Sequence, residues 1–414
     1  MDTLAYFEIP LGDLNTKSAY GGSPELLEKL YQHLEGAKEI HISFFLYNNP
    51  HLHIFLENLV SEKKCKVVIY TIPLEGYDSR PVKITHNNGR ERKLSKREYA
   101  NKIASRISSF EGMELRFMPH TNVWNKQYFS RGRASYGLHN KSIMVIKTEG
   151  IIECLSTSSN LALGDPRHSE NVFVSKRLQE VKMFEQYFEL LRQHSLTATE
   201  YDRFREEHED FHYVTDPINL KDEYGDCYFS APFIKYEDQG SNHYIQNKII
   251  NLIENVNKRL YICSQHFSDL NSFDKNAQSI VNAIGTKASQ SSNIDIKILK
   301  QTRAKNQKQG KRTAETENFL RQFSNVQQKY WDPVIHDKFI IADNNLLITT
   351  ANFTSTQFAW ASPRLMEYEF NNEIHKVNNT FSDINSFHFL YEDRLAEKYN
   401  EHFQSLWERS TTVF

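Results

Sequence analysis

The sequence is poor in cysteine, has no long apolar run and carries almost no net charge. Its four cysteines are far apart, with no Cys-x-x-Cys pair, which argues against a zinc site or a disulfide framework and for buried free thiols. No stretch approaches the roughly 20 apolar residues that cross a membrane. The first residues lack the basic segment and apolar core of a secretion signal. We therefore expect a soluble, cytoplasmic protein of a reducing compartment, without a transmembrane segment.

The composition is that of a folded protein with a local rather than a global charge pattern. The 414 residues have a formal net charge of −2, so any site for an anion must be built from a local cluster of bases. A hydrophobic fraction of 39% and an aromatic fraction of 13% argue against wholesale disorder. The length suits two domains of about 200 residues each.

The chain repeats one plan of secondary structure. Helices are predicted at 23–35, where Ser23 caps and Pro24 opens the helix, and at 242–256. Strands are predicted at 39–47 and 65–72 in the first copy and at 259–267 and 294–299 in the second. Helical segments at 177–209 and 383–409 close the copies. This alternation predicts two α/β halves, 1–215 and 216–414, each with a largely parallel or mixed sheet.

Two short stretches carry the same chemical pattern. His139 and Lys141 begin one apolar run, and His336 and Lys338 begin another. A hydroxyl-rich cluster follows each run and ends in Asn160 or in Asn352. Because alternate side chains of a strand share a face, each pair offers an imidazole and an ammonium to one place. Two such half-sites brought together suit a phosphodiester, which needs a nucleophile, a proton donor and positive charge.

The repetition makes this pattern specific. Of the 17 histidines, only His139 and His336 have lysine at the second position after them. The lysine precedes its asparagine by 19 residues in one copy and by 14 in the other. A single His-x-Lys is expected by chance in a chain of this composition. A matched context that occurs twice is not.

A basic segment follows the equivalent strand in each copy. Ligands of α/β sheets gather beyond the carboxyl ends of the strands, so the two segments could flank a groove for a polyanion. The alternative is a solvated surface segment. Trp124 and Trp331, just upstream of the two motifs, are candidates for base stacking. The predicted substrate-binding bases are Arg90, Arg92 and Lys93 in the first segment and Arg303, Lys305 and Lys308 in the second.

The motifs resemble the signature of the phospholipase D superfamily, which is His-x-Lys, four residues, Asp, and then a Gly/Ser-Ser-x-Asn cluster. The first copy has Ile146 where the family usually has Asp, a departure similar to the tyrosyl-DNA phosphodiesterase branch. The second copy matches at His336, Lys338, Asp343, Thr350 and Asn352, and the first at His139, Lys141, Ser158 and Asn160.

The resemblance implies two similar α/β halves with the active site at their interface, and a covalent phosphohistidine mechanism that needs no metal or other cofactor. By this analogy His139 is the nucleophile and His336 the acid and then the base, although the sequence alone is symmetric on this point. Glu170 and Glu373 match the family's downstream acid, which backs the active-site histidine. Asp343 is expected to brace the loop or the lysine rather than to touch phosphorus.

The leading hypothesis is therefore a nuclease that cleaves DNA or RNA. One alternative is a phospholipase or phosphatidyltransferase that acts on lipid. Another is a non-catalytic, nucleic-acid-binding subunit of a restriction, repair or defence complex, with partner proteins. The sequence does not distinguish DNA from RNA or an endonuclease from an exonuclease, and it does not indicate the oligomeric state.

Overall fold

The computed structural model describes most of the chain. The described residues are 2–9, 23–72, 81–85, 91–95, 102–107, 110–118, 138–162, 168–207, 218–220, 225–231, 233–236, 244–268, 279–301, 307–331, 335–354, 357, 365–370, 373–378 and 383–412. They belong to two compact units, Met1–Gly132 with Gly137–Phe211, and Arg133–Tyr136 with His212–Phe414. The predicted boundary after residue 215 lies outside the described residues, so its place stays a prediction.

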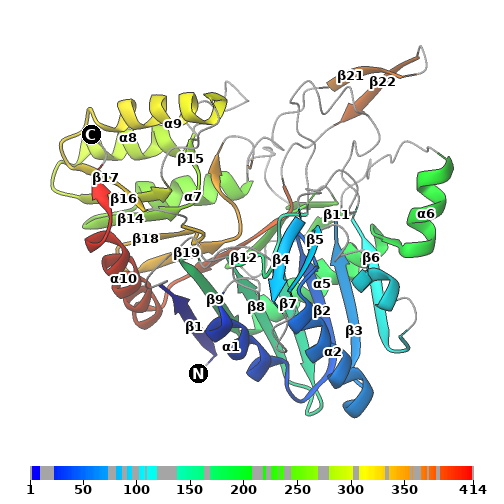
Figure 1. Cartoon of the computed structure of the whole chain (residues 1–414). Helices are drawn as coiled ribbons and strands as arrows, with labels where there is room; N and C mark the ends of the chain where they lie inside the picture. Colours follow the sequence, from blue (N-terminus) through cyan, green and yellow to red (C-terminus); the bar gives the residue numbers. More distant parts are fainter. Residues whose placement is uncertain are drawn as a thin grey trace. The chain divides into compact units, whose positions relative to one another are not determined.

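The first unit is built on an eight-stranded mixed sheet with the order β1-β9-β8-β7-β2-β3-β6-β10 (Figure 1). Strands β2, β3 and β6 run parallel to one another, and the other neighbours pair antiparallel. The strands are β1 (Thr3–Glu8), β2 (Ala37–Phe44), β3 (Lys66–Thr71), β6 (Met113–Phe117), β7 (Lys141–Lys147), β8 (Ile152–Thr157), β9 (Glu170–Ser175) and β10 (Leu196–Thr197).

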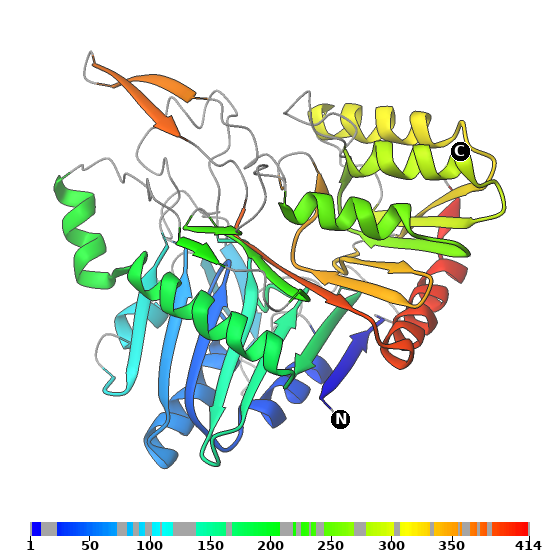
Figure 2. The same cartoon turned by 180° about the vertical axis from the view of Figure 1, so that it is seen from behind.

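Helices cover both faces of this sheet. Figure 1 shows α1 (Pro24–Leu34) and α2 (Pro50–Lys63) in front of it, and Figure 2, which views the sheet from the other side, shows α5 (Leu178–Gln193) on the opposite face. As predicted, Ser23 caps α1, and its hydroxyl accepts a hydrogen bond from the backbone N–H of Leu26 at 3.2 Å. Alternate residues of β2, Ile40, Ile42 and Phe44, are buried in one core with the apolar residues of α1 and α2.

The second unit repeats this plan. Its eight-stranded sheet has the order β12-β23-β19-β18-β14-β16-β17-β24, which matches the first sheet strand for strand. Figure 1 shows α7 (Tyr244–Glu254), α8 (Ile280–Gln290) and α9 (Gln307–Leu320) on one face and α10 (Asp393–Glu408) on the other. The predicted pair of α/β halves, each a mixed sheet flanked by helices, is confirmed. The strands are β12 (Cys227–Ser230), β14 (Arg259–Ser264), β16 (Asp295–Gln301), β17 (Val326–Trp331), β18 (Phe339–Ala342), β19 (Asn345–Thr349), β23 (Asn385–Leu390) and β24 (Thr411–Thr412).

Both predicted closing helices were too long. The segment 177–209 contains α5, the short strand β10 and then α6 (Ala198–Glu207), because β10 pairs with the sheet edge at β6. In the segment 383–409, residues Asn385–Leu390 form β23, and the helix begins only at Asp393. All six residues of β23 are buried between β12 and β19, which is typical of a strand covered on both faces.

Four two-stranded ribbons complete the described strands. They are β4 (Pro81–Thr85) with β5 (Glu91–Ser95), β11 (Ile218–Leu220) with β13 (Ile234–Tyr236), β15 (Phe267–Ser268) with β20 (Phe353–Thr354), and β21 (Leu365–Phe370) with β22 (Glu373–Asn378). None of the helices in the described ranges is long and apolar enough to span a bilayer. The prediction of buried free thiols is confirmed for Cys65, Cys154, Cys227 and Cys263.

Candidate active site

Each His-x-Lys motif stands at the start of a central strand of its sheet. His139 and Asn140 directly precede β7, which begins at Lys141, and His336, Asp337 and Lys338 directly precede β18, which begins at Phe339. The ammonium of Lys141 donates to the carbonyl oxygen of His139 at 2.7 Å, and that of Lys338 donates to the carbonyl oxygen of His336 at 2.6 Å. Both lysines are fully buried. In each unit the cation is thus held against the backbone of its own histidine.

The asparagine-bearing loops are also held identically in the two units. The hydroxyl of Thr157 donates to the carbonyl of Asn171 at 2.7 Å and accepts from the N–H of Ser159 at 3.0 Å. The hydroxyl of Thr349 donates to the carbonyl of Ser386 at 2.7 Å and accepts from the N–H of Ala351 at 3.0 Å. The same hydrogen-bonded turn therefore precedes Asn160 in the first unit and Asn352 in the second.

The second hydroxyl of each cluster braces the neighbouring strand. Ser158 accepts from the N–H of Asn171 at 2.9 Å, and Thr350 accepts from the N–H of Ser386 at 3.0 Å. Both side chains are buried. These contacts are consistent with the prediction that Ser158 and Thr350 support the loop and do not carry the chemistry.

The same contacts correct the position assigned to the second acid. Asn171 and Ser386 are equivalent by their hydrogen bonds, so the residue before each, Glu170 and Asn385, must be equivalent as well. Glu373 instead begins β22, beside the turn of the ribbon that β22 forms with β21. The chain between Asn352 and Asn385 contains this ribbon, whereas Glu170 comes ten residues after Asn160, so spacing along the sequence was misleading.

Glu170 lies in a buried pair with a second histidine. One of its carboxylate oxygens is 3.6 Å from Nδ1 of His168, and both residues are buried. The part of Glu170 in backing His139 stays a prediction. Within either unit taken by itself, the described residues bring no three His, Cys, Asp or Glu side chains close enough to hold a metal ion.

Asp343 braces the turn that precedes β14. Its carboxylate accepts hydrogen bonds from three consecutive backbone N–H groups, of Asn257, Lys258 and Arg259, at 2.8–2.9 Å. Burial raises the pKa of this carboxyl, but the three backbone hydrogen bonds outweigh it and the pKa is lowered. Asp343 therefore holds a loop, as the sequence led us to expect.

The first unit holds the corresponding turn with a cation. The ammonium of Lys147, the residue after Ile146, donates to the carbonyls of His33 and Glu35 at 2.5 and 2.6 Å. These carbonyls lie at the end of α1, where a cation is favoured because the last carbonyls lack partners within the helix. The apolar Ile146 thus leaves the turn supported by another residue.

The middle residue of each motif differs in charge. Asn140 is buried and accepts from the hydroxyl of Ser142 at 2.8 Å. Asp337 is also buried, and its carboxylate is 2.9 Å from Nε2 of His402 on α10. In the second unit the motif segment is thus tied to its closing helix through a carboxylate and an imidazole, whereas in the first unit Asn140 is hydrogen-bonded to Tyr187 of α5.

The segment after the neighbouring strand adds residues that the sequence analysis missed. The ring of Phe45 lies edge-on to the ring of His139, with 5.9 Å between centroids. In the second unit the backbone N–H of His266 donates to the amide oxygen of Asn352 at 3.4 Å. Burial, and secondly the charge of Lys338, lower the pKa of His266 to about 4. Only their position after a strand adjacent to the motif strand could have pointed to these residues.

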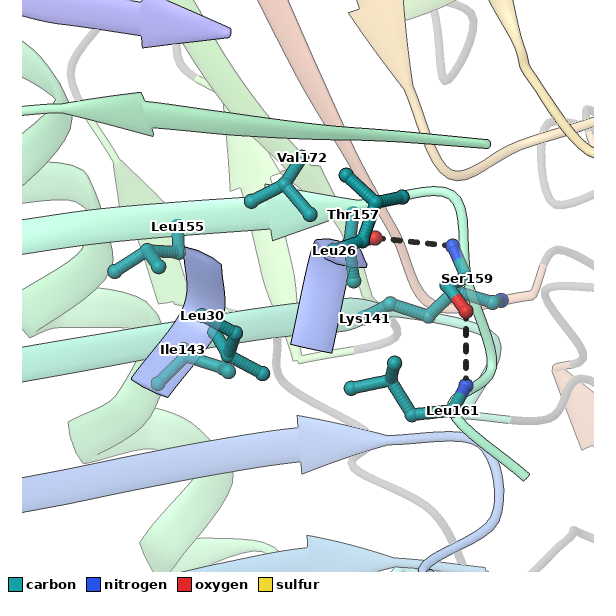
Figure 3. A pocket seen from close by; sticks show the side chains of 9 residues that line it. All are labelled: Leu26, Leu30, Lys141, Ile143, Leu155, Thr157, Ser159, Leu161 and Val172. Carbon is teal, nitrogen blue, oxygen red and sulfur yellow. Dashed lines mark hydrogen bonds between the residues drawn. The ribbon is translucent and has the colours of Figure 1, made fainter. Parts of the chain in front are cut away.

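A small apolar cavity lies under the first motif. It is lined by side chains of α1, β7, β8 and β9 together with the stem of Lys141 (Figure 3). At about 10 Å³ it has room for no more than one water molecule, so it packs the lysine stem and is not a substrate pocket.

The predicted substrate-binding residues are only partly placed. Trp331 ends β17 and is 4% exposed, which does not favour it as an open stacking surface. Arg92 and Lys93 lie on β5 and Lys308 lies on α9, with side chains that are not described. Trp124, Arg90, Arg303 and Lys305 lie outside the described residues.

No protein-family model matches the sequence, and no curated protein matches it significantly. Among solved structures, phosphatidylserine synthase from Haemophilus influenzae matches with a TM-score of 0.59 and 12% sequence identity, over 99% of this chain and 87% of that chain. The chain has the phospholipase D fold. The resemblance inferred from the two motifs is thereby confirmed at the level of the fold.

Solved structures of two other enzymes are also similar to this chain. Polyphosphate kinase from Porphyromonas gingivalis matches with a TM-score of 0.51 and 9% identity, over 92% of this chain and 45% of that chain, so the chain spans less than half of that protein. A yeast tyrosyl-DNA phosphodiesterase matches with a TM-score of 0.46 and 12% identity, over 94% of this chain and 90% of that chain. That score does not decide the branch of the superfamily.

Proposed function

We propose that the protein is a metal-independent phosphodiesterase that cleaves nucleic acid through a covalent phosphohistidine. The observation that carries the proposal is the repeated half-site, in which a buried lysine is held against its histidine and a threonine anchors the loop that ends in asparagine. Displacement at phosphorus spreads negative charge over the non-bridging oxygens and requires fixed donors and cations. We assign this task to Lys141, Lys338, Asn160 and Asn352.

In the proposed reaction both motif histidines serve one phosphodiester. Neutral His139 attacks phosphorus, so that a nitrogen–phosphorus bond forms while the bond to the leaving oxygen breaks. His336 enters protonated and gives its proton to that oxygen. It then takes a proton from water, whose oxygen attacks phosphorus and breaks the nitrogen–phosphorus bond. The cycle consumes one water and restores both imidazoles.

The choice of His139 as nucleophile is supported by its surroundings. A nucleophilic imidazole must be unprotonated, and apolar neighbours disfavour the charged form. Phe45 lies against His139, and the next residue, Leu46, is buried. In the second unit the corresponding segment is polar, with Gln265 and His266.

A polyanionic substrate is supported by bases that lie close together in the sequence or in the strand register. Lys83 and Lys93 are register partners in the β4–β5 ribbon. Lys311 and Arg312 are exposed on α9. Lys300, in contrast, is buried in an ion pair with Glu317 at 3.0 Å and is not available to a substrate.

A lipid substrate is the second candidate, and the likeness to a phosphatidylserine synthase favours it. Incubation with vesicles of phosphatidylcholine and phosphatidylglycerol, followed by assay of released head groups, tests this candidate. Head-group release without cleavage of nucleic acid would replace the nuclease by a lipid enzyme.

The nuclease itself is tested with labelled single- and double-stranded DNA and RNA in excess EDTA. We expect cleavage that persists in EDTA and falls at least about 1,000-fold in His139→Ala, since loss of the nucleophile removes the covalent route. His194→Ala, which removes a histidine outside both motifs, is the matched control and should cleave like the wild type. Salt-dependent binding without turnover would instead indicate a non-catalytic subunit.

A further inference from the structure

A short segment of the second unit is fastened to the asparagine-bearing loop at three points. The hydroxyl of Ser264 donates to the carbonyl of His266 at 2.8 Å and accepts from the N–H of Phe353 at 3.5 Å. The N–H of His266 donates to the amide oxygen of Asn352 at 3.4 Å. Directly after it, Phe267 pairs with Phe353 in the β15–β20 ribbon. The backbone of His266 is thus fixed beside Asn352.

The imidazole of His266 is near enough to Lys338 for the lysine charge to act on it. The residue is half-buried, and its ring makes no hydrogen bond to any residue that the structure describes. Burial and the charge of Lys338 hold the pKa of the ring at about 4, so it is neutral at pH 7. A neutral imidazole offers one N–H donor and one acceptor.

The first unit has no such group at the same position. Ser43 pairs with Ser142 on the motif strand, and Cys263 pairs with Phe339, so counting forward from each makes Leu46 the counterpart of His266. Leu46 is 1% exposed and packs with Ala162 and Phe45. The fold therefore needs only an apolar side chain here, and the imidazole of the second unit is not explained by packing.

We propose that His266 contacts the substrate at the second half-site, where its neutral N–H donates a hydrogen bond to the phosphoryl oxygen that Lys338 and Asn352 also hold. The inference rests on the proposed function of that half-site. A neutral donor next to a lysine binds a phosphoryl oxygen without the repulsion that a second cation would bring.

Two substitutions separate a hydrogen bond from packing. His266→Phe keeps an aromatic ring and removes the N–H, whereas His266→Gln removes the ring and keeps an N–H donor. With bis(4-nitrophenyl) phosphate and with an oligonucleotide, we expect His266→Phe to lower kcat/KM by about 10- to 100-fold, as for loss of one fixed donor. We expect His266→Gln to retain more activity than His266→Phe. Gln290→Ala, at an exposed glutamine that ends α8, is the control and should stay within about twofold of the wild type.

The assignment is overturned if His266→Phe is as active as the wild type, or if His266→Gln is no more active than His266→Phe. The melting temperature of each variant is measured alongside, and the comparison is made between variants that are folded at the assay temperature. Failure of the proposed function would be seen separately, as a wild type that turns over no phosphodiester. In that case calorimetric binding of inorganic phosphate to the same variants tests the contact, with weaker binding to His266→Phe than to His266→Gln supporting it and equal binding overturning it.

Discussion

At the scale of the residue, the two units support equivalent turns with opposite charges. Asp343 accepts three backbone N–H groups before β14, and Lys147 donates to two carbonyls at the end of α1. Each solution satisfies backbone groups that would otherwise lack partners. Asp343 thus holds a loop in the second unit, and Lys147 supports the equivalent turn in the first unit, where the signature Asp is replaced by Ile146.

Replacement of Asp343 should therefore affect stability more than catalysis. We expect Asp343→Ala to lower the free energy of unfolding by about 1–2 kcal/mol in urea denaturation, since hydrogen bonds to a charged group are lost. The lowered pKa means that this contribution is present above the unfolded-state pKa of about 3.9 and is lost as the pH falls through the folded-state value. The difference between wild type and variant should shrink below pH 4. A large fall in kcat at unchanged stability would assign Asp343 to the chemistry instead.

The neutral state of His266 has a measurable consequence for stability. Its pKa in the folded protein is about 4, against about 6.5 in the unfolded chain. The unfolded chain therefore takes up the proton first, and the wild type should lose stability as the pH falls from 6.5 towards 4. Between pH 7 and pH 5 we expect His266→Gln to lose less unfolding free energy than the wild type, by about 2 kcal/mol. Parallel curves for the two proteins would contradict the buried, neutral ring.

Chemistry at the level of single residues was only partly predictable from the sequence. The two motifs were visible because His139, Lys141, His336 and Lys338 are repeated at fixed spacing. The position of Asn385 was hidden, because equivalence there is set by a hydrogen bond to Thr349 on another strand and not by distance along the chain. The place of His266 was hidden as well, because it is set by a hydrogen bond to Asn352, which is far away along the chain.

At the scale of the element, the second unit ties the segment that precedes β18 to α10 by a buried carboxylate–imidazole pair. Asp337 and Nε2 of His402 are 2.9 Å apart, and both residues are buried. In the first unit the closing helix α5 contributes Tyr187, whose hydroxyl is hydrogen-bonded to Asn140, the counterpart of Asp337, and lies 3.1 Å from the hydroxyl of Ser43. The first unit makes this connection with neutral groups and the second with ionisable ones.

We expect that the Asp337–His402 pair can be replaced by the neutral pair of the first unit only if both residues are changed together. Loss of one partner leaves a buried polar group unsatisfied, so we expect His402→Leu to lower the free energy of unfolding by about 3 kcal/mol. The double variant Asp337→Asn with His402→Tyr imitates the first unit and should be more stable than His402→Leu. Chemical denaturation of the single and double variants measures this. Equal stabilities for all of them would mean that the pair carries no structural role.

Helices and strands were predicted well where a local amphipathic pattern defines them. They were predicted poorly where pairing with a strand far away in the sequence determines the secondary structure. Ser23, Pro24 and the alternating residues of β2 defined α1 and β2 correctly. The strand β23 was mistaken for helix, because both of its faces are buried and its identity depends on β12 and β19. The same holds for β10, whose two residues pair with β6.

At the scale of the whole molecule, a net charge of −2 leaves anion binding to local bases. The ribbon β4–β5 opposes Lys83 to Lys93 and is the natural place to test this. We expect Lys83→Glu to weaken binding of single-stranded DNA by about 10-fold at low salt and to flatten the salt dependence of Kd. Lys38→Glu, a change of the same charge at an exposed lysine of β2, is the control and should change Kd much less. Equal losses in both variants would point to a general charge effect.

The central claim is that His139 and His336 act on one phosphate, with His139 as the nucleophile. The most direct test is to quench the enzyme during turnover of a labelled phosphodiester under basic conditions and map the phosphorus adduct by mass spectrometry. The account predicts an adduct on the imidazole of His139 that accumulates in His336→Ala with a substrate whose leaving group needs no proton. An adduct on another residue, or turnover in EDTA with no histidine adduct at all, would contradict it.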